Sequence, residues 1–249
     1  MENEASREML RGIVDLTPME VAEMQVLKEK ITKKGEGKEE CKKEFARKVK
    51  YLTAGIPEIY WDLGMEHFVG DPSAKEIVER YLSLFEEMIE GGLGLLFLGG
   101  YGTGKTMLSC IIGKHAIEKG YTVRYMPIAS ILDNIMAGFG DKAVKERLNT
   151  IVTRVEILII DDWGKEYQGF GDKLGPLVTI EFDRIFRDRI NRKKVTIGSS
   201  NYGADDIVKK YGYSIMSVLS ASMQIVKVTG TDHRLAMTDK IKAKLLGKK

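Results

Sequence analysis

The residues best suited to chemistry form a glycine-rich stretch that ends in a lysine and a threonine. Its sequence, which satisfies the phosphate-loop pattern G-x-x-x-x-G-K-[ST], is Gly99-Gly100-Tyr101-Gly102-Thr103-Gly104-Lys105-Thr106. The glycines let backbone N–H groups converge on phosphates, Lys105 can reach the β- and γ-phosphates, and the Thr106 hydroxyl can bind Mg²⁺. An apolar run precedes the stretch and an amphipathic helical pattern follows it, which disfavours a chance glycine turn. We therefore predict nucleotide binding, with ATP and Mg²⁺ as cofactors.

A pair of carboxylates follows a second apolar run. Residues 155–160 have the composition of a buried strand and end in Asp161-Asp162, where the carboxyl edge of a parallel sheet is expected. Asp161 is predicted to hold Mg²⁺, directly or through water. Asp162 is then predicted to orient and deprotonate the attacking water. Paired aspartates can also cap a turn, but the upstream phosphate loop favours the catalytic interpretation.

Asn201 ends a third β-branched run, residues 195–200. Asn after a strand is also typical of a plain turn. Its place after the Asp161-Asp162 strand favours a role in sensing the γ-phosphate and the attacking water.

The elements that must position these side chains are predicted strands alternating with helices. The strands are expected at 94–98, 121–126, 157–160, 195–199 and 224–228. This alternation predicts an α/β fold: a three-layer P-loop NTPase with a parallel five-stranded sheet and helices on both faces. Residues 229–249 are too few for a full C-terminal lid domain. Residues 1–50 are predicted to be a small helical, partner-binding N-terminal appendage, with a linker at 33–40, and residues 51–249 the ATPase domain.

Composition sets outer bounds on the protein class. The chain has 249 residues, 43% of them hydrophobic and 30% charged, as in ordinary globular proteins. Two cysteines, no membrane-length apolar run and a polar N-terminus predict a cytoplasmic protein without membrane contact. The formal net charge of +3 is too small to argue for nucleic acid by itself.

Residues 54–236 resemble the DnaC/DnaI-type helicase loaders and the similar IstB-type transposition ATPases of the AAA+ class. The resemblance is carried by Ala54-Gly55-Ile56-Pro57, residues 99–106, Ile159-Ile160-Asp161-Asp162-Trp163-Gly164 and Ser199-Ser200-Asn201. It implies that the strand ending at Asn201 lies between the phosphate-loop strand and the strand of the acidic pair. It also implies ATP-driven homo-oligomers and single-stranded DNA in a central channel. By the same resemblance, Arg234 matches a late functional arginine.

The resemblance also shows a departure at the position where loaders carry an arginine that reaches the neighbouring subunit's ATP. Val218 occupies that place here. The candidates for a replacement lie on the preceding helix, with Arg189 the first choice, although such residues can also simply solvate a helix face: Arg184, Arg187, Arg189 and Arg192. Without a replacement, slow hydrolysis is expected.

Three functional hypotheses follow. The leading one is an AAA+ ATPase that loads or remodels a replicative helicase on single-stranded DNA, its main partners. The second is a transposition ATPase that assembles on duplex DNA and recruits a transposase. The third is an ATP switch protein with little turnover. Residues considered for DNA contact are Tyr125, Ser130, Lys142 and Lys145.

Overall fold

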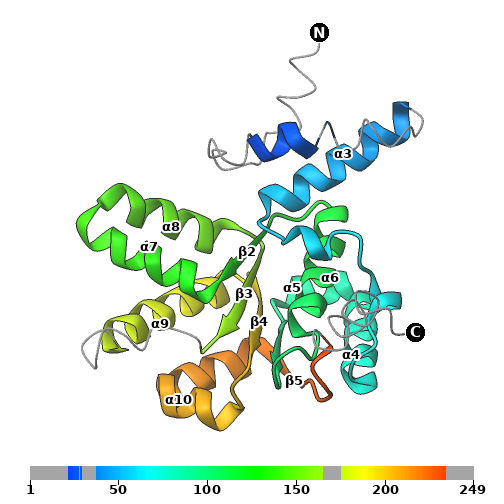
Figure 1. Cartoon of the computed structure of the whole chain (residues 1–249). Helices are drawn as coiled ribbons and strands as arrows, with labels where there is room; N and C mark the ends of the chain where they lie inside the picture. The colour runs from blue at the N-terminus through cyan, green and yellow to red at the C-terminus, as the bar shows by residue number, and fades with distance from the viewer. Residues whose placement is uncertain (1–21, 28, 30–37, 165–174, 234–249) are drawn as a thin grey trace, which may run out of the picture.

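The computed structural model describes residues 22–27, 29, 38–164 and 175–233 (Figure 1). Its strands are β1 (Gly94–Leu98), β2 (Val123–Pro127), β3 (Ile157–Trp163), β4 (Val195–Ser200) and β5 (Met223–Lys227). Its α-helices are α3 (Lys38–Thr53), α4 (Pro72–Ser83), α5 (Phe85–Gly91), α6 (Lys105–Glu118), α7 (Ile128–Gly140), α8 (Lys142–Arg154), α9 (Gly175–Asn191) and α10 (Ala204–Ser222). Two short 3₁₀ helices, η1 (Glu58–Tyr60) and η2 (Met65–His67), lie between α3 and α4. The five strands fall where the sequence predicts them, to within two or three residues at each end.

All five strands form one parallel sheet in the order β2-β3-β4-β1-β5. Strand β4 therefore lies between β1 and β3, which confirms the expected three-layer P-loop architecture. Since the strands are parallel, their carboxyl ends share one edge of the sheet. The phosphate loop follows β1, the acidic pair ends β3 and Asn201 follows β4, so all three meet at that edge.

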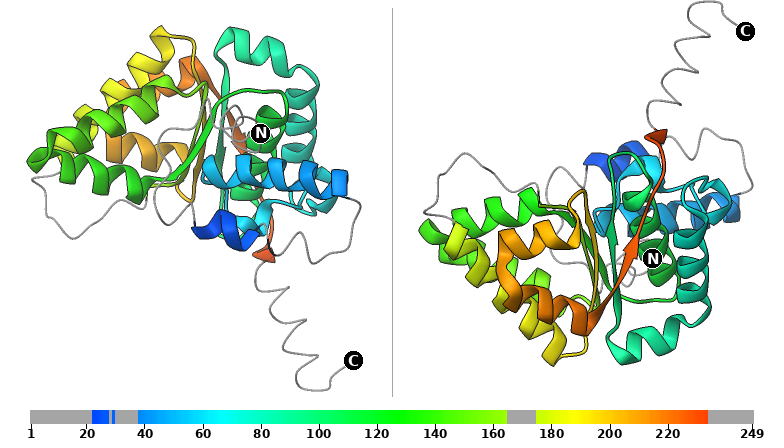
Figure 2. Two further views of the ribbon diagram at one scale, coloured as in Figure 1. Left: turned by 90° about the horizontal axis from the view of Figure 1, so that it is seen from above. Right: turned by 90° about the horizontal axis from the view of Figure 1, so that it is seen from below.

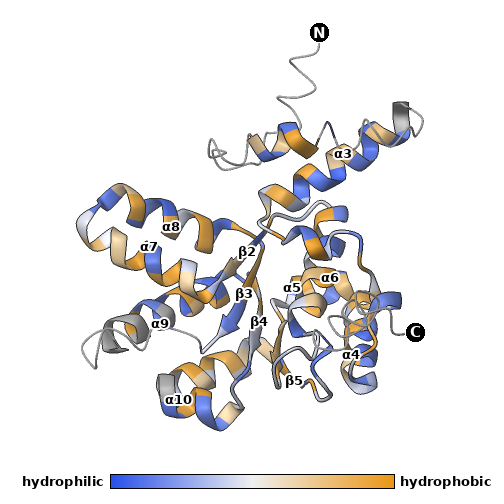
Figure 3. Ribbon diagram, viewed as in Figure 1, coloured by the Kyte–Doolittle hydropathy of each residue, from blue (hydrophilic) through white to orange (hydrophobic). Residues whose placement is uncertain are grey.

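Alternating side chains of each strand feed two hydrophobic layers. Leu95 and Phe97 of β1 enter one layer, whereas Leu96 and Leu98 enter the other, as the two-residue period of a strand requires. Helices α3 to α6 cover the first face and α7 to α10 the second (Figure 2). Figure 3 shows β3 changing from apolar to hydrophilic toward its carboxyl end, which places the acidic pair at the edge of this core.

Asp71-Pro72, the apolar stripe Ile77, Tyr81, Phe85, Met88 and Ile89, and Gly91-Gly92 together predict one helix, but the structure forms two there, α4 and α5. Asp71 caps α4 by accepting from the N–H groups of Ser73 and Ala74, and the chain breaks at Leu84, whose φ is −105° and ψ 22°. Gly92 ends α5 with a φ of 70° in the left-handed region, where glycine carries no Cβ penalty. The sequence does not predict the break, because the apolar spacing continues across Leu84.

Helix α3 runs across residue 50, where the sequence places the end of an appendage. Val49 and Tyr51 are each 2% exposed and belong to the same hydrophobic cluster as Leu95 and Phe97 of β1. Lys48 pairs with Glu44 and Asp62, at 2.9 and 3.1 Å. The last residues of the predicted linker, from Lys38, are already helical. The carboxyl half of α3 therefore packs into the hydrophobic core on one face of the sheet.

Among the residues that the structure describes, none of the helices is both long and apolar enough to span a bilayer.

Candidate functional site

Lys105 opens helix α6 directly behind the phosphate loop. Its side chain is 5% exposed, and Nζ donates to the carbonyls of Gly99 and Gly100, at 2.9 and 2.6 Å, and to Asn201 Oδ1 at 2.8 Å. A lysine ammonium held among oxygens at the N-terminus of a helix is a site where anions are favoured. The loop therefore has the charge and the backbone geometry that phosphates require.

Two glycines give the loop its shape. Gly102 has a φ of 68° and Gly104 of 94°, both in the left-handed region. A Cβ at Gly104 would lie 2.6 Å from the Phe68 ring, so this aromatic packs directly under the loop. Tyr101 keeps its side chain 61% exposed and contributes to the loop through its backbone.

The Asp161 carboxylate is surrounded by three hydroxyl groups from three different elements. Thr106 Oγ1 lies 3.0 and 3.1 Å from its two oxygens, and the Tyr125 hydroxyl donates to Oδ2 at 2.6 Å. Ser199 Oγ donates to Oδ1. Asp161 is 6% exposed, so these contacts replace most of the water around a buried charge. Burial, followed by the nearby Asp161 charge, raises the pKa of Tyr125, which keeps its hydroxyl protonated as a donor.

A β-bulge brings the second carboxylate to the same edge. Ile160 pairs with Gly198 and Trp163 with Ser200, so β3 carries one residue more than β4 between these points. Asp162 takes up the extra residue with a φ of 58°, a conformation uncommon for non-glycine residues. In a regular strand, Asp161 and Asp162 would point to opposite faces. The bulge re-aims Asp162, and its N–H lies 3.2 Å from Ser199 Oγ.

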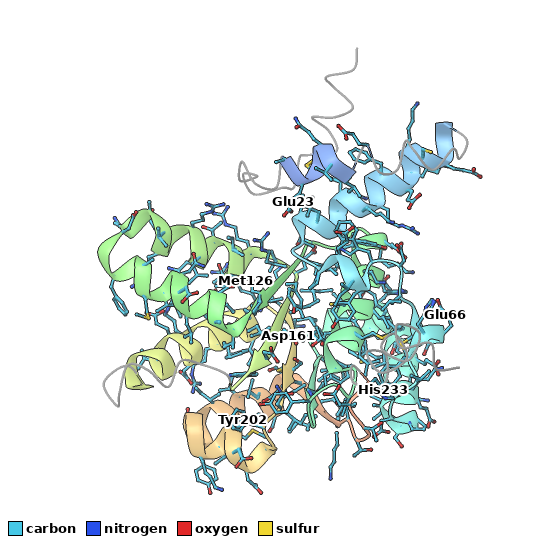
Figure 4. The ribbon with its side chains drawn as sticks, in the orientation of Figure 1. Glu23, Glu66, Met126, Asp161, Tyr202 and His233 are labelled. Atoms are coloured by element: carbon cyan, nitrogen blue, oxygen red, sulfur yellow. The ribbon has the colours of Figure 1, made fainter. Side chains whose placement is uncertain are left out.

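Asn201 joins the two sides of the site. Its Oδ1 accepts from Lys105 Nζ, and its Nδ2 lies 3.3 Å from Asp162 Oδ1. The structure thus brings together Lys105, Thr106, Asp161, Asp162 and Asn201, as the sequence predicts. Figure 4 labels Asp161 near the middle of the molecule, between the two helical layers.

The segment after β5 also reaches the phosphate loop. The N–H of His233 donates to the Gly102 carbonyl at 3.1 Å, and a Cβ at Gly102 would lie 1.7 Å from Asp232 Oδ1. Further back, Thr229 donates through both its N–H and its hydroxyl to Asp71 Oδ2. The contacts of Ser199, Asp232 and Phe68 at this site were not predictable from the sequence, because each joins segments that are distant along the chain. Arg234, the expected late arginine, lies outside the described residues.

Arg189 does not fit the role of an arginine that reaches a neighbouring subunit. Its side chain is 0% exposed, and Nε donates to Thr196 Oγ1 at 2.9 Å. Burial lowers its pKa to about 9, which leaves it charged at neutral pH. The guanidinium donates to the backbone carbonyls of Val152, Val155, Glu156 and Val195. The expectation that Arg189 reaches a neighbouring subunit was wrong because the side chain turns inward, where four backbone carbonyls accept from its guanidinium.

Arg184 and Arg187 of α9, and Arg192 just after its end, lie at the surface, and each is paired. Arg184 bonds to Glu181 and Asn149, and Arg187 to Asp183 and Ser214, while Arg192 bonds to Asp188. Val218 of α10 packs against the second hydrophobic layer. To reach the ATP of a neighbouring subunit, each of these arginines would therefore have to break the hydrogen bonds that it makes in this structure.

The residues considered for DNA contact are dispersed. Tyr125 is 8% exposed and holds Asp161, so its side chain faces the interior. Lys142 and Lys145 lie on α8 and face Glu146 and Glu181, at 3.5 and 3.9 Å. Ser130 is half-buried on α7, with its carbonyl accepting from Asn134.

The donor set fits a magnesium nucleotide. Mg²⁺ prefers hard oxygen ligands, and the Thr106 hydroxyl and Asp161 carboxylate face each other at hydrogen-bond distance beside the loop. Thr106 and Asp161 would hold Mg²⁺, which would neutralise charge on the phosphates. Lys105 Nζ, held at the carbonyls of Gly99 and Gly100, supplies a further positive charge at the loop.

The fold and this site define a P-loop nucleotide-binding protein of the AAA+ class. A family model described as IstB-like ATP binding protein matches residues 74–204, more than half of the chain. The chain therefore belongs to the family of IstB-like ATP-binding proteins, which confirms the resemblance drawn from the motifs.

The individual relatives include both an insertion-sequence ATP-binding protein and a helicase loader. The chain is similar to the ATP-binding protein of insertion sequence IS1162 from Pseudomonas fluorescens, 34% identical over 70 residues, covering 28% of this chain and 30% of the relative. It is also similar to the replicative helicase loader DnaC of Buchnera aphidicola subsp. Baizongia pistaciae, 26% identical over 124 residues, covering 49% and 50%. This chain thus spans half or less of the length of these relatives.

Its fold resembles that of the replication initiator DnaA bound to AMPPCP and single-stranded DNA. The TM-score is 0.57 at 21% identity, over 78% of this chain and 57% of that one.

Proposed function

We propose that this protein binds ATP with Mg²⁺ at the edge of the sheet and hydrolyses it. The observation that carries the proposal is the convergence of Lys105, Thr106, Asp161, Asp162 and Asn201 within one set of hydrogen bonds, although they come from three separate strand ends. These residue types match the needs of phosphoryl transfer, in which positioning and charge stabilisation supply most of the catalysis.

Each residue has a separate task in this proposal. Lys105 binds the β- and γ-phosphates, and Thr106 with Asp161 holds Mg²⁺. Asp162 accepts a proton from the attacking water, and Asn201 holds the Asp162 carboxylate while contacting Lys105. Because Asn201 bonds both Lys105 and Asp162, loss of the γ-phosphate at Lys105 would also change the position of the Asp162 carboxylate.

The larger role that we propose is to load or remodel a replicative helicase on single-stranded DNA, driven by ATP binding and hydrolysis. The similarity to the DnaC helicase loader supports the helicase as partner, and the DnaA structure with bound single-stranded DNA supports that ligand. In this scheme ATP favours an oligomer that holds DNA, and hydrolysis releases it.

A transposition ATPase that assembles on duplex DNA is the second candidate. It is favoured by the IstB-like family model and by the insertion-sequence relative. Size-exclusion chromatography with light scattering separates the two, using wild type and Asp162→Asn with ATP and either single-stranded or duplex DNA at fixed salt. Oligomers preferring single strands support loading, and filaments on duplex support the alternative. A monomer that binds ATP without assembling would contradict both.

Turnover by the isolated protein is proposed to be slow. At position 218, where loaders carry the arginine, this chain has a valine that packs against the core, and Arg189 is fully buried. Neither position therefore supplies a guanidinium to a neighbouring subunit. Such an arginine accelerates hydrolysis about 10³- to 10⁵-fold where it has been measured. Undetectable hydrolysis even with DNA and helicase present would favour the nucleotide-switch hypothesis instead.

A further inference from the structure

We propose that Tyr125 is a positioning residue through which helix α3 sets the orientation of the Asp161 carboxylate, and thereby the affinity of the nucleotide site for Mg²⁺. The inference rests on the proposed function, because it concerns the metal that accompanies ATP.

The hydroxyl of Tyr125 fixes one oxygen of the metal-binding carboxylate. It donates to Asp161 Oδ2 at 2.6 Å, while Ser199 holds Oδ1. These two residues lie on β2 and β4, the strands on either side of β3, so the carboxylate is held from both sides. Thr106 Oγ1, on helix α6, lies within hydrogen-bond distance of both Asp161 oxygens. Hydrogen bonds of this kind, one step removed from a metal, commonly change its affinity about 10- to 100-fold.

A tyrosine at this position is not explained by core packing alone. The side chain is 8% exposed, and Phe would fill the same space without burying a hydroxyl. A buried hydroxyl is unfavourable unless it finds a partner, and its partner here is the carboxylate that faces Thr106. The contact is therefore the specific property that Tyr adds over Phe.

The backbone of the same residue is attached to the end of α3. The N–H of Tyr125 donates to the Ala54 carbonyl at 2.7 Å, and Arg124 Nη1 donates to the Thr53 carbonyl at 2.8 Å. The last carbonyls of a helix need donors from outside it, and the edge strand β2 supplies them. Figure 1 shows this end of α3 meeting β2.

The end of α3 and strand β2 lie so close together that neither has much freedom to move relative to the other. Gly55 has a φ of 79°, and a Cβ there would lie 2.8 Å from the Tyr125 carbonyl. Helix α3 is held further by the Tyr51 hydroxyl, which donates to Glu118 on α6. A partner that displaced the carboxyl end of α3 would therefore move the backbone of Tyr125, and with it the hydroxyl that holds Asp161.

The test measures binding of a fluorescent, non-hydrolysable ATP analogue to the full chain while Mg²⁺ is titrated, with a parallel measurement in EDTA. For Tyr125→Phe we expect the Mg²⁺ midpoint to rise about 10-fold, with metal-free binding unchanged. The matched control is Tyr81→Phe, which removes another buried tyrosine hydroxyl, bonded at 2.7 Å to the Leu93 carbonyl far from the site. A Tyr125→Phe midpoint within twofold of wild type would overturn the positioning role.

Coupling to α3 is tested with Gly55→Ala, which leaves Tyr125 itself intact should the Phe variant fail to fold. We expect this substitution to raise the Mg²⁺ midpoint, and to have no further effect in the Tyr125→Phe background. Gly120→Ala is its control, because Gly120 has a similar φ of 93° but open space around it. Independent, multiplicative effects of Gly55→Ala and Tyr125→Phe would overturn the coupling.

The two levels of proposal fail differently. If wild type does not bind the analogue at any Mg²⁺ concentration, the proposed function falls. If wild type binds with a clear Mg²⁺ dependence that Tyr125→Phe leaves unchanged, the proposed function stands and only this inference falls.

Discussion

Asn201 Nδ2 lies 3.3 Å from Asp162 Oδ1, and the other amide atom of the same side chain accepts from Lys105. One amide thus spans the distance between the residue assigned to the phosphates and the one assigned to the attacking water. Asp162→Asn keeps an oxygen to face Asn201 but removes the basic group. We expect ATP binding to be retained and hydrolysis to fall about 10²- to 10⁴-fold, measured by phosphate release and by nucleotide titration.

The control for that variant is Asp188→Asn, which alters an acidic residue paired with Arg192 on the surface of α9. It is expected to hydrolyse ATP as wild type does. Wild-type turnover in Asp162→Asn would remove Asp162 from the catalytic assignment.

Lys105→Ala is expected to weaken ATP binding at least about 10-fold, since a hydrogen bond to a charged group contributes roughly 1.5–3 kcal/mol. A fluorescent nucleotide titration measures the effect. Lys119→Ala, at the far end of α6 with a 3.8 Å ion pair to Glu86, is the matched control and should bind normally. Unchanged affinity in Lys105→Ala would mean that the site has been assigned to the wrong residues.

Arg189→Met is expected to destabilise the fold by about 3 kcal/mol, because it leaves buried backbone carbonyls without a donor. Urea unfolding followed by circular dichroism measures the change. Arg192→Met, at an exposed position just after the end of the same helix, should stay within about 0.5 kcal/mol of wild type. An Arg189→Met protein as stable as wild type, yet defective in hydrolysis only when assembled, would restore Arg189 as an intersubunit arginine.

Asp71 links the start of α4 to the segment after β5. The two hydrogen bonds from Thr229 lower the pKa of Asp71 to about 2, from an ordinary 3.8. A depressed pKa means that the ionised link stabilises the fold fully above about pH 4 and is lost as the pH falls toward 2. Asp71→Asn retains a helix cap but loses the charge. We expect its thermal midpoint to lie below that of wild type by a constant amount from pH 7 to 5, the gap narrowing below pH 4.

Thr229→Val serves as the reciprocal change, since it removes the hydroxyl donor from the other side. Its effect should have the same sign and the same pH range. A gap between wild type and Asp71→Asn that widens on acidification would contradict the link.

The strands and the five site residues followed from local signals in the sequence: glycine spacing, an apolar run, or a polar residue at a strand end. The order of the strands in the sheet came instead from the family resemblance. Arg189 was misjudged because the carbonyls that draw it inward come from the ends of α8, β3 and β4, which only the fold brings together. The hydrogen bonds from Ser199 and Tyr125 to Asp161 could not be predicted for a similar reason. A strand pattern shows that Tyr125 is buried, but not which carboxylate its hydroxyl meets on the next strand.

The single extra residue in β3 makes the site sensitive to chain length and not only to residue type. Substitutions at Asp162 change the chemistry but leave the number of residues between Ile160 and Trp163 intact. A deletion of one residue there would let β3 pair with β4 without interruption, and would leave a regular strand with a single carboxylate at its end. Random libraries should therefore tolerate substitutions more readily than deletions between these two positions, even where the deleted strand pairs perfectly well.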